Sequence, residues 1–253
     1  RDGLYGLQAE VLFFPVSNEE GYSPRVAMQH TRSYRELDPG TKANLNRLYD
    51  HFYYHRHDQF WREQAMVKLP AITRATNMLI CGEDLGMVPA SVPGVMKELG
   101  LLSLEIQRMP KDSSKEFDHP ADAPYLSVVS PSTHDMPTIR GWWEQDPAET
   151  QQFYHQILGR GDQMPVFCEP WIAEDILQQH FHSPAMWAIL PIQDLLAMDG
   201  ELRKEDPHSE QINVPANPDH YWQYRLHLTV DELLAAQAFN ERLANLIRQS
   251  GRG

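Results

Sequence analysis

Glu83 and Asp135 are acidic residues that stand where short apolar runs give way to polar residues, 52 positions apart. Such a pair can break an acetal, because one carboxyl gives a proton to the departing oxygen while the other faces the oxocarbenium-like transition state. The two roles need different environments, one that keeps a carboxyl protonated and one that keeps it ionised. Spacing alone leaves a plainer interpretation open, that of an acidic surface on which such pairs arise by chance.

The immediate neighbours of these two residues narrow the chemistry only partly. Adjacent strand residues point to opposite faces, so Glu83 and Asp84 cannot both face a substrate, and the spacing does not say which one does. His134, which precedes Asp135, could bind a sugar hydroxyl. A histidine at a strand end could equally be a structural hydrogen bonder.

A second constellation, His51 and His55, has the four-residue spacing of a metal pair on a helix. The zinc-protease pattern requires Glu after the first histidine, whereas this sequence has Phe52. His57 and Asp58 add possible ligands, but no known pattern supplies a third one. We therefore favour packing of aromatic and histidine side chains on one helix face, and we predict neither a metal nor a cofactor.

Trp142 and Trp143 follow the His-Asp stretch and fit two interpretations equally, a platform for a sugar ring or part of the core. The sequence contains no dinucleotide fingerprint, no phosphate-binding P-loop and no nucleophile elbow.

Four short apolar runs position these residues, and each run turns polar only at its carboxyl end. They cover residues 78–81, 101–106, 125–129 and 186–190. Apolar runs of this length suit strands that are buried on both faces. Helical patterns separate most of them, and strand–helix alternation predicts a parallel α/β sheet with its chemistry at the carboxyl ends of the strands.

The predicted helices have recognisable starts and ends. They cover residues 42–69 with Pro70 as terminator, 91–99, a helix begun by Asp146-Pro147, 172–181, and a final helix opened by the capping box Thr229–Glu232, with Leu233, Leu234, Phe239, Leu243, Leu246 and Ile247 on its apolar side. The first 40 residues read as irregular. We therefore divide the chain into an insertion-like segment, 1–70, and an α/β part, 71–253. Four strands cannot close an eight-stranded barrel alone.

Composition limits the partners. The net charge of −13 repels phosphate backbones and argues against nucleic acid and anionic membranes. The sequence contains no run of 18 apolar residues, so no membrane helix is predicted.

Two cysteines, Cys81 and Cys168, are too few for a disulfide framework, and a reduced, cytoplasmic location is expected. The chain begins with Arg1 rather than Met, so we expect a processed or truncated protein.

Four motifs, in the right order, resemble the amylomaltase type of 4-alpha-glucanotransferase. The motifs are E-D-L-G-x-x-P at 83–89, T-H-D at 133–135 with R-G-W at 140–142, P-I-Q-D-L-L at 191–196, and N-V-P at 213–215 with W-x-x-R at 222–225. Within this family, the sequence around His220 and the helix at 51–61 most resemble the long branch that contains the plant cytosolic enzyme.

The resemblance implies a (β/α)8 barrel of the TIM type, of which the four predicted strands would be the fifth to eighth. It implies that Glu83 is the general acid/base and that Asp135 stabilises the transition state. The implied substrates are alpha-1,4-glucans, maltooligosaccharides and glucose. The expected substrate-contacting residues are His134, Trp142, Gln193 and Asn213, with shaping roles for Gln193, Asn213 and Arg225.

One departure from the family pattern matters most. The family nucleophile is an Asp in an R-x-D-H motif on the fourth strand, and this sequence has no R-x-D-H. The resemblance implies a retaining, two-step mechanism with a covalent glucosyl-enzyme. We therefore expect this chain to be inactive alone, because the nucleophile would precede Arg1.

Two other functions stay open from the sequence. The first is a non-catalytic alpha-glucan-binding module on a decayed barrel, which would keep the aromatic residues and not need Glu83. The second is an alpha-glucan hydrolase, which shares the first chemical step and transfers to water. A half-barrel also exposes sheet edges and apolar surface, so we expect copies to associate or the first 40 residues to be partly disordered.

Overall fold

The computed structural model of the protein describes residues 2–16, 21–84, 86 and 88–252. The chain divides into two compact units. One is formed by Arg1–Asn77 with Met87–Val95, and the other by Met78–Gly86 with Met96–Gly253. The predicted acid pair, Glu83 and Asp135, belongs to the second unit.

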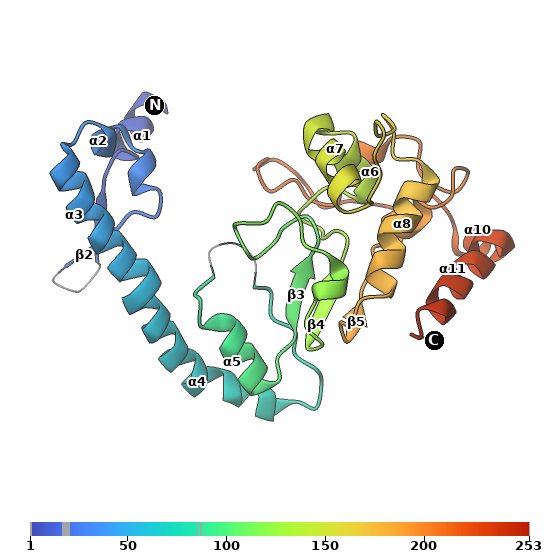
Figure 1. Cartoon of the computed structure of the whole chain (residues 1–253), viewed down its shortest axis with the longest axis horizontal. Coiled ribbons are helices and arrows are strands. Elements are labelled where there is room, and N and C mark those ends of the chain that lie inside the picture. The colour runs from blue at the N-terminus through green and yellow to red at the C-terminus, as the bar shows by residue number, and fades with distance from the viewer. Residues whose placement is uncertain (1, 17–20, 85, 87, 253) are drawn as a thin grey trace. The chain divides into compact units, whose positions relative to one another are not determined.

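A parallel sheet forms the centre of the second unit. Its strands β3 (Ser103–Ile106), β4 (Ser127–Ser130) and β5 (Trp187–Ala188) lie side by side in chain order (Figure 1). The chain before Glu83 continues this order beside β3, because Cys81 pairs with Leu102 in parallel and the Gly82 amide donates to the Leu102 carbonyl at 2.8 Å. The predicted parallel α/β arrangement is confirmed for these four segments.

Helices and short turns connect and cover the sheet. The helices are α6 (Ile139–Trp143), α7 (Pro147–Gln156), α8 (Pro170–Phe181), α9 (Ile192–Leu196), α10 (Val230–Ala235) and α11 (Gln237–Gln249), with 3-10 turns η3 (Pro120–Asp122) and η4 (Pro207–Glu210). Helix α5 (Val92–Leu99) precedes β3, and its residues are divided between the two units. Asp146 caps α7 as predicted, accepting from the Ala148 amide at 2.9 Å. Thr229 and Glu232 form the predicted capping box of α10.

The core of this unit lies among the helices. Fully buried side chains of α6, α7 and α8 pack together, and α8 also contacts α9 and α11. The largest of them include Trp143, Phe153, Ile172 and Leu177. This core holds α6 and α9 against the carboxyl end of the sheet, where the predicted site residues lie.

The last predicted helix is wrong in one respect, because it is two helices. Ala236 has a non-helical ψ of 62° and separates α10 from α11. The change of direction buries Phe239 and Leu246 of α11, whereas Leu234 of α10 is 70% exposed. A capping box and an apolar pattern indicate where a helix begins, but they do not reveal a single residue at which it turns.

The first unit contains more structure than the predicted irregular start. Its elements are α1 (Asp2–Gln8), the antiparallel pair β1 (Phe13–Pro15) and β2 (Tyr22–Pro24), η1 (Met28–His30), α2 (Arg32–Arg35), α3 (Pro39–Asp50), the π-helical segment η2 (His51–Arg56) and α4 (His57–Ala75). Met28, Tyr34 and Tyr49 form a small buried core. The Tyr49 hydroxyl donates to the Val26 carbonyl at 2.9 Å, a contact between distant residues that local pattern does not encode.

Pro70 does not end the long helix as predicted. It lies inside α4, which continues to Ala75. A proline removes one helical hydrogen bond and strains its surroundings, but it does not prevent later residues from bonding normally. The Thr73 hydroxyl donates to the Pro70 carbonyl at 3.1 Å.

Candidate active site

A cleft of about 500 Å³ opens at the carboxyl ends of the parallel segments. Every segment contributes to its lining, which includes Glu83, Leu104, Val128, Ser130, His134 and Ile189. Leu104 and Val128 are paired neighbours on β3 and β4, and they face this cleft together. Glu105 and Val129, one residue further along, line a separate cavity of about 90 Å³. Strand alternation therefore assigns one face of the sheet to the cleft.

The structure resolves which of the two neighbouring acids faces this cleft. Asp84 is buried, and its carboxylate accepts from the Leu104 amide at 2.9 Å and from Lys111 Nζ at 2.7 Å. Glu83 is exposed and lines the cleft. A Cβ at Gly82 would come within 2.9 Å of the Met96 methyl group, so a larger residue there would require the Met96 side chain to shift.

His134 and Asp135 occupy the turn that follows β4. His134 lines the same cleft as Glu83. The His134 ring nitrogen Nε2 lies 3.1 Å from Asp135 Oδ2, and both side chains are a little under half exposed. The predicted residue Asn213 comes to the same place, and its side-chain amide donates to Asp135 Oδ1 at 2.5 Å. The Asn213 backbone amide also donates to the His134 carbonyl at 3.0 Å.

Trp142 lies in the core, 6% exposed, and the sugar-platform interpretation does not fit this position. Its ring packs edge-to-face against Phe117, Phe153 and Trp143. The Arg108 guanidinium lies over the ring, 4.8 Å from its centroid. Trp142 therefore packs against the Arg108 cation, which is partly buried.

Gln193 is also buried, in the first turn of α9. Its side-chain amide donates to the Glu210 carbonyl at 3.3 Å. This contact favours the shaping role expected for Gln193 over direct contact with a substrate.

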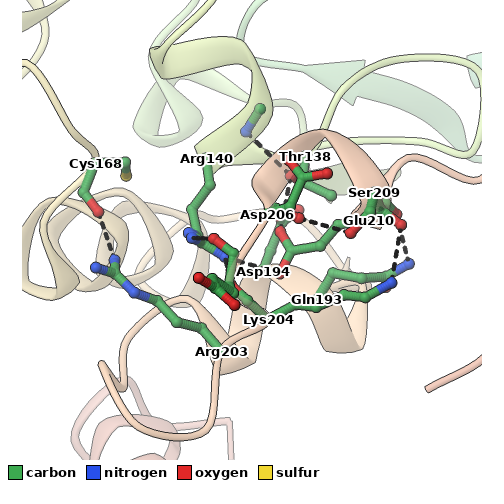
Figure 2. Close-up of polar contacts among 12 residues, drawn as sticks. Thr138, Arg140, Cys168, Gln193, Asp194, Arg203, Lys204, Asp206, Ser209 and Glu210 are labelled. Carbon is green, nitrogen blue, oxygen red and sulfur yellow. Dashed lines mark hydrogen bonds and ion pairs between the residues drawn. The ribbon is translucent and has the colours of Figure 1, made fainter. Parts of the chain in front are cut away.

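A buried ion pair joins the two segments that carry Asp135 and Asn213 (Figure 2). Arg140 Nη1 lies 3.0 Å from Glu210 Oε1, with both side chains almost fully buried. The Thr138 hydroxyl donates to the other Glu210 oxygen at 3.3 Å, and Arg140 also donates to the Lys204 carbonyl at 2.7 Å. Burial raises the pKa of the Glu210 carboxyl, and the Arg140 charge opposes that shift.

The sequence assigned no role to three residues around the site, although two of them, Asp194 and Trp222, lie within the family motifs. Trp222 is 55% exposed, and its ring centroid lies 4.9 Å from that of His134. Burial raises the pKa of Asp194, a fully buried carboxyl, and lowers the pKa of Arg108 to about 10. The signal for Asp194 was present in the sequence, because it closes the polar end of the fourth apolar run.

The histidine pair of the first unit, His51 and His55, lies among aromatic side chains. The rings of His51 and His55 lie 6.4 Å apart in the π-helical segment, and His57 stacks on Tyr53. Among the described residues, no group of three His, Cys, Asp or Glu side chains could hold a metal ion. In the same part of the chain, each helix is too short or too polar to cross a bilayer.

A parallel sheet with a cleft and carboxylates at its carboxyl end defines an α/β protein with a candidate acid–base site. The family model described as 4-alpha-glucanotransferase matches residues 19–229. The chain belongs to this family.

Individual relatives agree with this family. The chain is 42% identical over all its 253 residues to 4-alpha-glucanotransferase DPE2 of Oryza sativa subsp. japonica, and it spans 27% of that protein. It is 34% identical over 185 residues to the 4-alpha-glucanotransferase of Chlamydia caviae, a match that covers 70% of this chain and 34% of the relative. The chain thus spans about a third or less of the length of these relatives.

Solved structures show the same fold. An amylomaltase from Streptococcus agalactiae in complex with acarbose superposes with a TM-score of 0.53, at 20% identity, over 69% of this chain and 32% of that one. An amylomaltase from Corynebacterium glutamicum gives a TM-score of 0.51, at 14% identity, over 70% of this chain and 29% of that one.

Proposed function

We propose that this chain is the C-terminal half of a 4-alpha-glucanotransferase barrel, containing strands five to eight of a (β/α)8 fold. Glu83 is its general acid/base and Asp135 the carboxylate that stabilises the transition state. The observation that carries this proposal is the common cleft of Glu83 and His134, with Asp135 next to His134 and hydrogen-bonded by Asn213. The substrates are alpha-1,4-glucans and maltooligosaccharides, with glucose as an acceptor.

The reaction has two steps that retain the configuration at the anomeric carbon. A nucleophilic carboxylate from upstream of Arg1 attacks this carbon while the Glu83 carboxyl protonates the departing glycosidic oxygen. A covalent glycosyl-enzyme forms and the donor's reducing-end portion leaves. The Glu83 carboxylate then takes the proton of an acceptor sugar hydroxyl, whose oxygen attacks the same carbon and releases the carboxylate. The ionised Asp135 stabilises the positive charge that develops on the sugar in both steps.

The decisive experiment compares Glu83→Gln with wild type in the full-length enzyme that contains this chain. We expect turnover of maltotriose to fall by about 10²–10⁴-fold or more, with binding largely kept, because glutamine can neither give nor take the proton. Glu201→Gln, an exposed carboxylate outside the cleft, is the matched control and should keep wild-type turnover. A glucan-binding module would lose nothing in Glu83→Gln.

Product analysis separates transfer from hydrolysis. With added glucose, a transferase makes maltose and longer oligosaccharides, whereas a hydrolase releases glucose at the same rate with or without the acceptor. The 253-residue chain alone should produce neither pattern, because it lacks the R-x-D-H nucleophile motif. Chromatographically clear transfer by this chain alone would refute the assignment of the nucleophile.

Two further proposals concern the chain alone. Leu79, Trp187 and Ile189 belong to the sheet segments and are about half exposed, so we expect copies of the isolated chain to associate. Light scattering that gives a single monodisperse monomer would contradict this. The net charge of −13 and two free cysteines favour a neutral glycan partner, rather than nucleic acid or membrane, in the cytoplasm.

A further inference from the structure

The residues from Pro131 to Ile139 form a connection between β4 and α6, which we call the His134 turn. It carries His134 and Asp135 at its centre. Its internal hydrogen bonds are long, with the Asp135 amide 3.3 Å from the Thr133 hydroxyl. Both central side chains are a little under half exposed. Other groups must therefore fix the place of this turn.

Arg108 contacts both ends of the His134 turn with one guanidinium group. Its Nη2 atom donates to the Pro131 carbonyl at 2.9 Å and to the Pro137 carbonyl at 2.8 Å. Its Nε atom also approaches the Pro131 carbonyl at 3.2 Å. The Trp142 ring supports the guanidinium from one side. A lysine could not reproduce this arrangement, because its ammonium lacks the planar fork and the stacking face.

Asp194 contacts the same two ends with its two carboxylate oxygens. One oxygen accepts from the Ser132 hydroxyl, and the other accepts from the Ile139 amide at 2.8 Å. Asp194 itself is fully buried in the first turn of α9, directly after β5. The Ser132 carbonyl in turn accepts from the Ser130 hydroxyl at 2.6 Å, which ties the start of the turn to β4.

Two side chains of opposite charge thus approach from the strands on either side of β4. Arg108 follows β3 and Asp194 follows β5, and each spans the start and the end of the turn between them. Hydrogen bonds at only one end of the His134 turn would allow its other end to move. Contacts at both ends, from both sides, restrict the position of the residues in the middle, which Asn213 also contacts directly.

We propose that Arg108 and Asp194 act together as positioning residues that hold His134 and Asp135 in place for catalysis. This inference rests on the proposed function, since it assigns the pair to the transferase reaction. Neither residue touches the sugar; each acts through the backbone of the turn. A displacement of about 1 Å at a catalytic group can cost about 100-fold in rate.

The kinetic test uses Arg108→Lys and Asp194→Asn in the full-length enzyme, with rates corrected for the folded fraction by near-ultraviolet circular dichroism. We expect kcat for maltotriose to fall about 100-fold with little change in KM, because Asp135 acts on the transition state. Arg203→Lys is the matched control, since Arg203 also donates to a backbone carbonyl, that of Cys168 at 2.6 Å, outside the His134 turn. The control should stay within about twofold of wild type, as expected where no transition-state contact changes.

A second readout does not depend on activity. The ring resonances of His134, identified with His134→Gln, should shift in Arg108→Lys and Asp194→Asn spectra of the full-length enzyme. Those of His227, which bonds to the Leu202 carbonyl, should stay in place. If either variant fails to fold, Ser132→Ala removes one contact of Asp194 and keeps the other, and its His134 resonances should shift as well.

The outcomes separate the two proposals. Full-length wild type without transfer activity would refute the proposed function, while the His134 resonances would still test the positioning of the turn. Variants with wild-type kcat and unmoved His134 resonances would overturn the positioning role and leave the function intact. A loss of kcat that only follows the folded fraction would also overturn it.

Discussion

The side-chain amide of Asn213 donates to Asp135 Oδ1 at 2.5 Å, although the two residues are 78 positions apart. The second oxygen of Asp135 lies 3.1 Å from the His134 ring. The carboxylate is therefore held by one neutral donor and one titratable donor. This arrangement fixes the orientation of the carboxylate.

Replacing Asn213 should change the pH dependence of the full-length enzyme. In Asn213→Asp, the new carboxylate lies next to the Asp135 carboxylate and the two negative charges repel each other. Ionisation of both groups therefore requires a higher pH. We expect the acidic limb of kcat/KM to move upward in pH. Asn213→Ala should lower kcat by about 10–100-fold, because one hydrogen bond to a charged group is lost. Coincident pH profiles for wild type and Asn213→Asp would contradict this role.

The two tryptophans near the site should respond in opposite ways. Trp142→Ala should lower the free energy of unfolding by about 3–5 kcal/mol, because it opens a cavity in a buried aromatic cluster. Trp222→Ala should change that free energy by less than about 0.5 kcal/mol, since the ring is 55% exposed. Urea unfolding at low protein concentration measures both. We also expect Trp222→Ala to raise KM for maltooligosaccharides, and an unchanged KM would remove Trp222 from the site.

The Arg140–Glu210 pair should be costly to break from one side. Glu210→Ala leaves the Arg140 charge buried and should cost about 3–5 kcal/mol of unfolding free energy. The double variant Arg140→Met, Glu210→Leu leaves no buried charge and should recover much of that loss. A double variant that is less stable than Glu210→Ala would show that the pair contributes more than mutual neutralisation.

His180 should make the second unit sensitive to mild acid. Its ring is fully buried, and burial lowers its pKa from 6.5 to about 4. Between these two values the unfolded chain binds a proton that the folded chain does not, so the free energy of unfolding rises with pH across this window. The difference of about 2.5 units corresponds to roughly 3 kcal/mol at most.

The matched variant for this test is His180→Gln, which cannot titrate. Other titratable groups line the same small cavity, namely Glu105, Lys115, Asp118, His119 and Asp122. They remain in both proteins, so the difference in urea stability between wild type and variant at pH 4.5 and pH 7 isolates the histidine. A difference that does not change with pH would contradict the lowered pKa of His180.

The parallel sheet could be predicted from the sequence, because each strand is a short apolar run and the polar residues that follow it are adjacent in the sequence. Residue type and motif also identified Glu83, His134, Asp135 and Asn213 as candidate site residues. Strand alternation could not choose between Glu83 and Asp84, since it only says that they face opposite ways, and the family motif alone assigned the role to Glu83. The choice depends on the Leu104 amide and Lys111, which are distant in sequence.

Trp142 shows a second kind of limit. A tryptophan near a catalytic motif has the same composition and spacing whether its ring faces a sugar or the core. Its position is decided by Phe117, Phe153 and Arg108, which contact it only after folding. The roles of Arg108 and Asp194 were overlooked for the same reason, because the groups that they contact, backbone atoms of the His134 turn and the Ser132 hydroxyl, are brought to them only by folding.

The anchored carboxylate of Asp84 makes this strand end intolerant of any change in length. Deleting Glu83 would move Asp84 into the cleft as an acid that is one methylene shorter. The Leu104 amide would lose its acceptor, and Lys111 would lose one carboxylate partner and keep Glu105. Deletion of this single residue would thus remove the proton donor and also the buried Asp84 contacts that orient it. Because adjacent side chains point to opposite faces, the position of an acid along the chain, and not only its presence, determines whether its carboxyl faces the cleft.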